Sequence, residues 1–350
     1  SNVCSSDLEF VELLPAQQRI AVDWYRGTAD AVYQNLDILS RHDPDYVLVL
    51  AGDHVYKMDY QKMLRFHQES AAEVTLAAIE VPIADARRFG VVAVDETDRV
   101  TGFLEKPQDP PAMPGNPNLA YASMGIYVFD SAVLIKALEE DAATPNSHHD
   151  FGKDIIPALI GRGRTYAYAF YDENKKAAKY WRDIGTIDAY YEAQMDLCHV
   201  NPEFNMYDPE WPLRTYMPQA PPAKFVFAED WRRGEAQDSL ISQGCIVSGS
   251  RIHGSILCPN VRVHSFCTIE QSILMPGVRV GRHARIRKAI IDRDVDIPRG
   301  ALIGFNPEED KRRHTVSEGG VVVVAAGDDP YVTPVSEAAL MLETEADRRG

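Results

Sequence analysis

The chain has 350 residues, 45% of them hydrophobic, and its 52 acidic against 36 basic residues give a formal net charge of −16. This length allows two domains, and the acidic balance argues against a general nucleic-acid binder, which normally carries a basic patch. No run of about 18 apolar residues occurs, so we expect no membrane partner, and five cysteines without a CxxC spacing fit a reduced cytoplasm.

Residues 1–8 carry no signal-peptide pattern. The letters VCSSDL at positions 3–8 are the translation of GTGTGCTCTTCCGATCT, a common sequencing-adapter end. We therefore expect residues 1–8 to be a non-native, adapter-derived scar, and we leave them out of the fold prediction. The natural protein would then begin upstream, with its first strands missing from this chain.

Strand-like and helix-like runs alternate between about residues 9 and 200. This alternation predicts a truncated α/β domain with a mixed, mostly parallel, Rossmann-like sheet. A helix is expected at 28–39, with Thr28 as its cap, and another near 132–139. The expected strands are 46–51, 74–81, 90–94, 100–104 and 125–129.

Asp53 follows the short apolar run at 46–51, which has the character of a parallel strand buried on both faces. Open α/β sheets bind their ligands at the carboxyl ends of such strands. Asp53 is therefore a candidate for chemistry. The run alone leaves a second interpretation open, in which Asp53 caps a helix.

Three other segments place polar groups at the ends of predicted elements. Gly27-Thr28 offers free backbone N–H groups to an anion or a base edge, although such a pair also simply starts helices. Lys106 suits a phosphate, or else a surface ion pair with Glu105. Asp183 precedes a second Gly-Thr turn, where a helix cap is the alternative.

Two carboxylates from distant segments, each at a strand end, suit Mg²⁺. This ion takes about six oxygens and usually combines one or two carboxylates with waters and substrate phosphates. The sequence has no GxSxG elbow and no Cys–His set, whereas phosphoryl and nucleotidyl transfers need mainly alignment and charge neutralisation. The DFG at 150–152 does not indicate a kinase, because no HRDxxxxN or VAIK accompanies it.

The second half of the chain carries a sequence repeat. Residues 201–232 are rich in proline and contain two tryptophans, which predicts a packed linker. From 233 to 325 aliphatic residues recur every 17 positions in five columns, of which Ile252, Ile269 and Ile286 form one. A constant period predicts a left-handed parallel β-helix rather than a β-sandwich, with coils that stabilise one another by stacking. Residues 326–350 are expected to form a tail.

Seven segments occur in a fixed order ahead of the β-helix: WYRGTADAV (24–32), LAGDHVYKMDY (50–60), FGVVAVD (89–95), FLEKP (103–107), ASMGIYVF (122–129), HDFGKDIIP (149–157) and YWRDIGT (180–186). Over about residues 9–325 the chain resembles bacterial glucose-1-phosphate adenylyltransferases (ADP-glucose pyrophosphorylases). The resemblance implies nucleotidyl transfer from ATP to α-D-glucose 1-phosphate, which gives ADP-glucose and pyrophosphate for glycogen biosynthesis.

The resemblance also implies roles for individual residues. Asp53 and Asp183 would hold Mg²⁺, with Asp53 the most damaging to lose, and Lys106 would bind the phosphate of glucose 1-phosphate. The roles implied for the remaining residues are sugar-phosphate binding by Tyr25, Gly90, Glu105 and Ser123, nucleotide binding by Gln17, Gly27 and Thr28, and allosteric AMP inhibition at Arg41 and Arg293.

The chain departs from the family pattern in two respects. The Gly-rich GxGxRLxPLT loop is not found in these residues, so the resemblance implies that this polypeptide alone has little or no activity. Ala326 stands where an activator-associated basic residue is expected, so control by fructose 1,6-bisphosphate is not implied.

By resemblance we expect a homotetramer in the cytoplasm. Alternative functions are a pyrophosphorylase for another sugar nucleotide, a non-catalytic regulatory subunit, and a β-helix acyltransferase that uses His253, His264 or His283. The presence of Asp53, Lys106 and Asp183 argues against the regulatory subunit.

Overall fold

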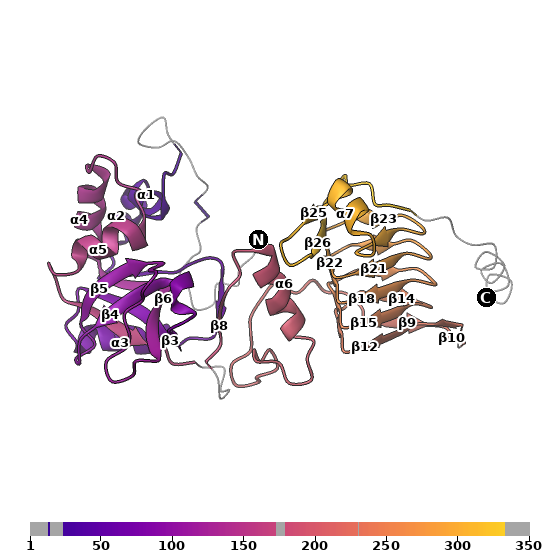
Figure 1. Cartoon of the computed structure of the whole chain (residues 1–350), viewed down its shortest axis with the longest axis horizontal. Coiled ribbons are helices and arrows are strands. Elements are labelled where there is room, and N and C mark those ends of the chain that lie inside the picture. The colour runs from indigo at the N-terminus through magenta and orange to yellow at the C-terminus, as the bar shows by residue number, and fades with distance from the viewer. Residues whose placement is uncertain (1–12, 15–23, 173–178, 230, 333–350) are drawn as a thin grey trace. The chain divides into compact units, whose positions relative to one another are not determined.

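A computed structural model describes residues 13–14, 24–172, 179–229 and 231–332 (Figure 1). The chain divides into two compact units. Unit 1 holds the described residues up to Gly52 and those from Lys57 to 172, and unit 2 holds Asp53–Tyr56 and the described residues from 179 onward. The predicted scar at 1–8 and Gln17 lie outside the described residues, and the domain boundaries drawn from the sequence stay predictions.

Unit 1 is built on a six-stranded sheet with the order β5-β4-β6-β3-β7, and β1 pairs with β6 off this path. Its strands are β1 (Tyr46–Val49), β3 (Val74–Pro82), β4 (Gly90–Val94), β5 (Val100–Glu105), β6 (Leu119–Asp130) and β7 (Thr165–Ala169).

The prediction of a mixed sheet is confirmed, but the expectation that it is mostly parallel is wrong. Among the described strands β3 and β7 are parallel, whereas β6 runs antiparallel to β1, β3 and β4, and β4 runs antiparallel to β5. The five-residue link between β4 and β5 is too short for a parallel crossover, which needs a dozen or more residues.

Strand β1 also differs from its prediction as a fully buried parallel strand. It pairs antiparallel with β6, and Leu48 on it is 38% exposed. Its apolar run reflects one packed face, since Val47 and Val49 contact the unit 1 core. Asp53 therefore does not gain its place from the end of a buried parallel strand.

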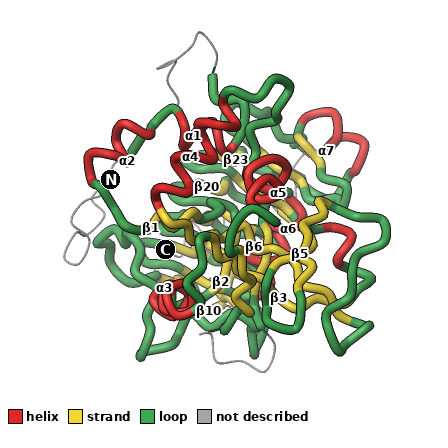
Figure 2. The backbone as a smooth tube through the Cα atoms, turned by 90° about the vertical axis from the view of Figure 1, so that its left-hand side faces the viewer, coloured by secondary structure: helices red, strands yellow, loops and turns green. Residues whose placement is uncertain are grey.

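The helices of unit 1 lie on both sides of this sheet. In Figures 1 and 2, α1 (Thr28–Tyr33), α2 (Leu36–His42), α4 (Ser131–Ala142) and α5 (Ile156–Leu159) gather on one side, and α3 (Tyr60–Glu69) lies on the other. The helix predicted over 28–39 is interrupted at Asn35, whose side-chain amide donates to the Ala31 carbonyl. Asparagine competes in this way with the backbone ladder of a helix.

A short π-helix, η2 (Phe151–Ile155), precedes α5. Phe151 and Ile155 join the buried core between the sheet and these helices, together with Phe129 and Leu134. The core thereby holds the DFG segment against β6.

Unit 2 begins with the antiparallel pair β2 (His54–Tyr56) and β8 (Trp181–Asp183), which is followed by α6 (Ile187–Asp196). The β-helix comes next. One of its sheets contains β9 (Lys224–Val226), β14 (Ile246–Ser248), β17 (Arg262–Val263), β20 (Arg279–Val280) and β23 (Asp296–Ile297).

The second sheet contains β12 (Glu235–Gln237), β15 (Arg251–His253), β18 (Thr268–Glu270), β21 (Arg285–Arg287) and β24 (Leu302–Ile303). The third contains β13 (Leu240–Ile241), β16 (Ile256–Leu257), β19 (Ile273–Leu274), β22 (Ala289–Ile291), β26 (Val322–Val324) and β25 (Thr315–Val316). The hairpin β10 (Ala228–Glu229) and β11 (Arg232–Arg233) and the helix α7 (Pro307–Arg313) complete the described elements of unit 2.

Parallel stacking of these coils matches the predicted left-handed β-helix. Ile252, Ile269 and Ile286 are direct register partners on β15, β18 and β21, and each is at most 1% exposed. The 17-residue period is thus the length of one coil. Strand β9 lies within the segment predicted as a linker and pairs with β14 at the start of this stack.

Candidate functional site

Asp53 and Asp183 approach one another in unit 2. A methyl group placed on the Gly185 Cα would lie 3.0 Å from Asp183 Oδ1 and 3.2 Å from Asp53 Oδ2. The pairing of β2 with β8 sets His54 opposite Asp183, and the Ile184 N–H donates to the Asp53 carbonyl at 2.9 Å. Two carboxylates from segments far apart in sequence therefore face a common point.

Neither carboxylate caps a helix, although this was the alternative interpretation of both. Asp53 precedes strand β2, and Asp183 Oδ1 accepts from the Gly185 N–H at 2.7 Å. The N-cap of α6 is instead Thr186, whose hydroxyl accepts from the Ala189 N–H. The two side chains keep oxygens available for another ligand.

His54 supports Asp53 from the side. Its Nε2 lies 3.7 Å from Asp53 Oδ1, and its ring stands edge-on to the Trp181 ring with centroids 5.0 Å apart. The Asp53 carboxylate is 58% exposed, whereas the His54 side chain is 12% exposed. A largely covered, packed imidazole thus borders an accessible carboxylate.

The carboxylates of Asp53 and Asp183 are ligands of the kind that a divalent cation binds. Mg²⁺ commonly takes one or two protein carboxylates and completes its shell with water and phosphate oxygens. Among the residues that the structure describes, no set of three or more His, Cys, Asp or Glu side chains is placed to hold a metal. The two carboxylates nevertheless fit a site that substrate phosphates complete.

A second group of predicted residues comes together in unit 1 where β4 begins and β5 ends. Gly90 and Glu105 are register partners, and a methyl group on Gly90 would lie 2.6 Å from the Phe103 ring and 3.0 Å from Glu105 Oε2. Only glycine leaves Phe103 and Glu105 in these positions. Gly152 faces the same two side chains, at 3.6 Å and 3.7 Å from its hypothetical methyl group.

Ser123 and Tyr127 extend this group along β6. Burial raises the pKa of Tyr127 to about 12, a hydrogen bond with the Ser123 side chain opposes the rise, and the charges of Asp150 and Glu105 add to it. Both carboxylates are therefore close enough to act on the phenol. The Tyr127 hydroxyl is therefore protonated at neutral pH and can donate a hydrogen bond.

We call Gly90, Glu105, Ser123, Tyr127 and Asp150 the sugar cluster, after the sugar-phosphate binding that the sequence predicts for Gly90, Glu105 and Ser123. Asp150 and Tyr127 were not among the predicted site residues. Both lie within the family-like segments 149–157 and 122–129, which are the sequence signal for their presence at the site.

Lys106 lies next to the sugar cluster. Its Nζ is 4.0 Å from Glu105 Oε1, and its side chain is 67% exposed. The backbone of Lys106 has φ +49°, and its N–H donates to the Phe89 carbonyl at 3.1 Å. The turn after β5 therefore begins with a backbone conformation that is uncommon for a residue with a side chain.

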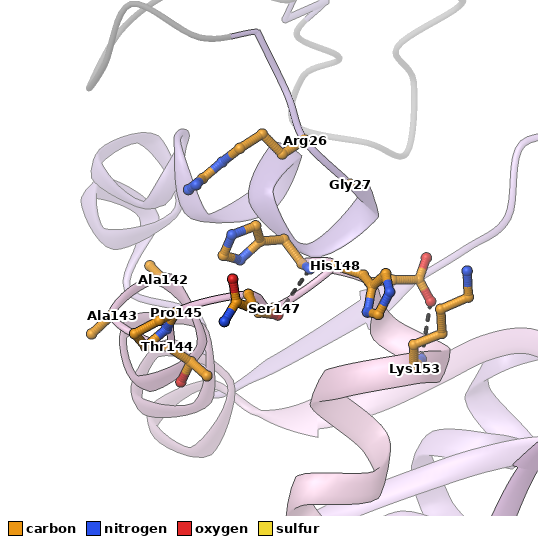
Figure 3. A pocket seen from close by; sticks show the side chains of 12 residues that line it. Arg26, Gly27, Ala142, Ala143, Thr144, Pro145, Ser147, His148 and Lys153 are labelled. Carbon is orange, nitrogen blue, oxygen red and sulfur yellow. Dashed lines mark hydrogen bonds between the residues drawn. The ribbon is translucent and has the colours of Figure 1, made fainter.

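The Gly27-Thr28 turn lies beside a cavity of about 590 Å³ (Figure 3). Figure 3 shows Arg26 and Gly27 on one side of this cavity and Ser147, His148 and Lys153 across from them. Asp150 also lines it. Gly27 of the predicted nucleotide-side turn and Asp150 of the sugar cluster thus line the same cavity.

The remaining predicted residues lie elsewhere. The Tyr25 hydroxyl accepts from the Asn35 amide at 2.9 Å. Arg41 pairs with Asp37 on α2 and belongs to unit 1, whereas Arg293 is exposed on the β-helix in unit 2. No helix among the described residues is long and apolar enough to span a bilayer.

Two family models match this chain. The model described as "Nucleotidyl transferase" matches residues 4–200, and the model described as "GlmU-like, C-terminal hexapeptide" matches residues 221–324. The two models together account for the α/β region and for the β-helix.

Curated relatives agree with this assignment. The chain is 53% identical over 322 residues to a glucose-1-phosphate adenylyltransferase of Dechloromonas aromatica (strain RCB), which covers 91% of the chain and 73% of the relative. The chain is 52% identical to the enzyme of the same name from Methylococcus capsulatus, over 90% of the chain and 74% of that relative. It is 54% identical to the one from Yersinia pseudotuberculosis, over 90% of the chain and 75% of that relative. The chain therefore belongs to the glucose-1-phosphate adenylyltransferase family of nucleotidyl transferases.

Proposed function

We propose that the protein transfers the adenylyl group of ATP to α-D-glucose 1-phosphate, with ADP-glucose and pyrophosphate as products. A phosphate oxygen of glucose 1-phosphate attacks the α-phosphorus of ATP, and the bond from that phosphorus to the β-phosphate oxygen breaks. The observation that carries the proposal is that Glu105 and Asp150 both lie beside Gly152 and act, together with Ser123, on Tyr127, with Lys106 next to Glu105, in a chain of this family.

The sugar cluster offers hydrogen-bond partners of both kinds to a hexose. The carboxylates of Glu105 and Asp150 accept from sugar hydroxyls, and Ser123 and the protonated Tyr127 donate. Lys106 binds the phosphate as a mobile point charge. We assign to Gly27, Thr28 and Gln17 the nucleotide side and to Tyr25 the sugar-phosphate side.

Nucleotidyl transferases typically use a divalent metal ion, and we assign Mg²⁺ to Asp53 and Asp183. When bound, the ion neutralises phosphate charge and favours the departure of pyrophosphate. The two carboxylates themselves orient that site, and the packed His54 keeps Asp53 in place. Proximity and alignment supply the rest of the rate, because this reaction needs no covalent intermediate on the protein.

Pyrophosphate release tests the proposal. The assay combines ATP, glucose 1-phosphate and Mg²⁺ with the product of the complete gene and, separately, with the chain of 350 residues. We expect ADP-glucose from the complete product, and the comparison measures the prediction that these residues alone have little activity. No ADP-glucose from the complete product would contradict the proposed function.

A nucleotide panel separates the main alternatives. Turnover with UTP, dTTP or GTP in preference to ATP would indicate a different sugar-nucleotide pyrophosphorylase. A protein that binds glucose 1-phosphate but turns over none of these nucleotides would instead support the regulatory subunit.

The assembly and the compartment are separate proposals. By similarity to the family we propose a homotetramer in the cytoplasm, without nucleic acid as a partner and with Arg41 and Arg293 in effector binding. Light scattering on the purified complete product measures the mass, and a monomer at micromolar concentration would contradict the tetramer.

A further inference from the structure

The Thr28 hydroxyl joins the nucleotide-side turn to the sugar cluster. It donates to Asp150 Oδ2 at 3.1 Å and accepts from the Phe151 N–H at 3.2 Å. A threonine hydroxyl has one proton to donate, and here that proton goes to a carboxylate 122 positions along the chain. The hydroxyl is thus committed to a contact between two segments that the proposed function assigns to different substrates.

The backbone around Thr28 reinforces this contact. The His149 carbonyl accepts from the Ala29 N–H at 2.8 Å and from the Asp30 N–H at 3.4 Å, at the start of α1. A methyl group on Gly27 would lie 2.3 Å from the His149 oxygen, so no side chain fits there. The turn and segment 148–151 are thus joined by backbone and side-chain hydrogen bonds.

Asp150 carries the contact into the sugar cluster. Its Oδ1 accepts from the Gly152 N–H at 2.9 Å and from the Lys153 N–H at 3.1 Å, and so caps η2. Gly152 faces Phe103 and Glu105. Oδ1 is held by the backbone, and within the described part of the chain the Thr28 hydroxyl is the side-chain partner that the structure shows for Oδ2.

We propose that Thr28 is a positioning residue for glucose 1-phosphate, which acts through Asp150 and makes the binding of the two substrates interdependent. The inference rests on the proposed function, because it takes the Gly27-Thr28 turn as the nucleotide side and Asp150 as a sugar partner. A nucleotide held by the backbone of the turn restrains Thr28, and Thr28 in turn restrains the Asp150 carboxylate. Glucose 1-phosphate then meets a carboxylate that is already oriented, and pre-organisation raises affinity.

Two substitutions of Thr28 separate the effect of its hydroxyl group from the effect of its side-chain shape. Thr28→Val keeps the volume and removes the hydroxyl, whereas Thr28→Ser keeps the hydroxyl. Titration calorimetry measures the Kd of α-D-glucose 1-phosphate with and without α,β-methylene-ATP and Mg²⁺, and this analogue cannot release pyrophosphate. We expect Thr28→Val to raise this Kd about tenfold, the usual effect of losing a hydrogen bond to a charged group, and Thr28→Ser to change it less than about twofold.

The effect of the nucleotide analogue on the Kd of glucose 1-phosphate, which we call the substrate coupling, is a readout that a purely structural role of Thr28 would not change. In the wild type we expect the analogue to lower the Kd of glucose 1-phosphate, and in Thr28→Val we expect this effect to disappear. Thr97→Val is the matched control, because the Thr97 hydroxyl also donates to a carboxylate, that of Asp95, but in an exposed turn. In Thr97→Val, the Kd of glucose 1-phosphate and its decrease in the presence of the analogue should both equal the wild-type values.

A double-mutant cycle covers the case in which Thr28→Val weakens the fold. If Thr28 acts through Asp150, Asp150→Asn and Thr28→Val together raise the Kd little more than Asp150→Asn alone, because contacting residues are not additive. Additive effects, or equal Kd values for Thr28→Val and Thr28→Ser, would overturn the inference while leaving the proposed function intact. A wild-type protein that binds no glucose 1-phosphate would contradict the proposed function, and the inference with it.

Discussion

Asp53 and Asp183 are about 130 positions apart in the sequence, yet both carboxylates lie within 3.2 Å of one point beside Gly185. Two carboxylates in such proximity repel one another, since like charges a few ångströms apart are unfavourable. A divalent cation removes this repulsion. The geometry at the scale of single residues therefore supports the assignment of Mg²⁺ to this pair.

Asp53→Asn tests the metal assignment. We expect turnover of the complete product to fall at least about 100-fold, because an amide neutralises neither the cation nor the phosphates. The free energy of unfolding should change by no more than about 0.5 kcal/mol, since the side chain is 58% exposed. The measurements are pyrophosphate release and urea unfolding, with Asp296→Asn on β23 as an exposed control. Unchanged turnover in Asp53→Asn would refute the assignment.

Lys106→Gln tests the phosphate contact. We expect the KM for glucose 1-phosphate to rise about tenfold or more and the KM for ATP to rise less, since a charge-assisted hydrogen bond to one substrate is lost. Lys136→Gln is a close match, because both ammonium groups lie 4.0 Å from a glutamate and are 67% and 78% exposed. Equal KM changes in the two variants would argue against the role of Lys106.

At the scale of elements, α6 is tied to the β-helix within unit 2. Asp188 near its start accepts hydrogen bonds from the Ser317 hydroxyl and the Gly319 N–H, and the Tyr191 hydroxyl donates to the Gln271 carbonyl. Tyr191 also packs against Ile273 and Ile290 in a separate apolar cluster. Because α6 follows Asp183 directly, these contacts hold one end of the segment that carries a proposed metal ligand.

These hydrogen bonds predict a pH dependence. The Ser317 hydroxyl, followed by the Gly319 N–H and the charge of Lys288, holds the pKa of Asp188 below its ordinary value of 3.8. A lowered folded-state pKa stabilises the fold above pH 3.8, and this contribution is lost as the pH falls through the folded value. Urea unfolding between about pH 3 and 6 measures this contribution. In Asp188→Asn the free energy of unfolding should fall less steeply as the pH is lowered than in the wild type. Asp296→Asn should leave the pH dependence of the free energy of unfolding unchanged. If Asp188→Asn showed the same pH dependence as the wild type, the expectation would be contradicted.

At the scale of the whole molecule, the chain has two compact units, each with a core of its own. The core of unit 2 consists of stacked β-helix coils, whose contacts are largely between neighbours in the stack. The core of unit 1 joins a mixed sheet to helices from distant segments. Chains with two cores commonly depart from two-state unfolding.

Scanning calorimetry tests this division. We expect two resolved thermal transitions, and glucose 1-phosphate should raise the transition of unit 1 alone, because a ligand stabilises the state that binds it. At a concentration of 100 times the Kd the stabilisation is about 2.7 kcal/mol. Galactose, which lacks the phosphate, serves as the control ligand. A single transition, or an equal shift of both, would contradict independent unfolding.

The sequence alone determined the features that depend on local pattern. The 17-residue period is read directly from residues such as Ile252 and Ile269, because stacked coils need a constant register. The positions of most strands and the order of the family segments can likewise be read from short stretches of the sequence.

The tertiary structure decided which distant groups meet. Strand direction in the sheet depends on non-local pairing, so β1 is antiparallel and half-exposed despite its apolar run. Asp53 faces Asp183 because β2 pairs with β8, and Asp150 and Glu105 both lie beside Gly152 because the core holds η2 against β6. Such contacts arise from packing energies spread over many residues, and no single segment of sequence contains them.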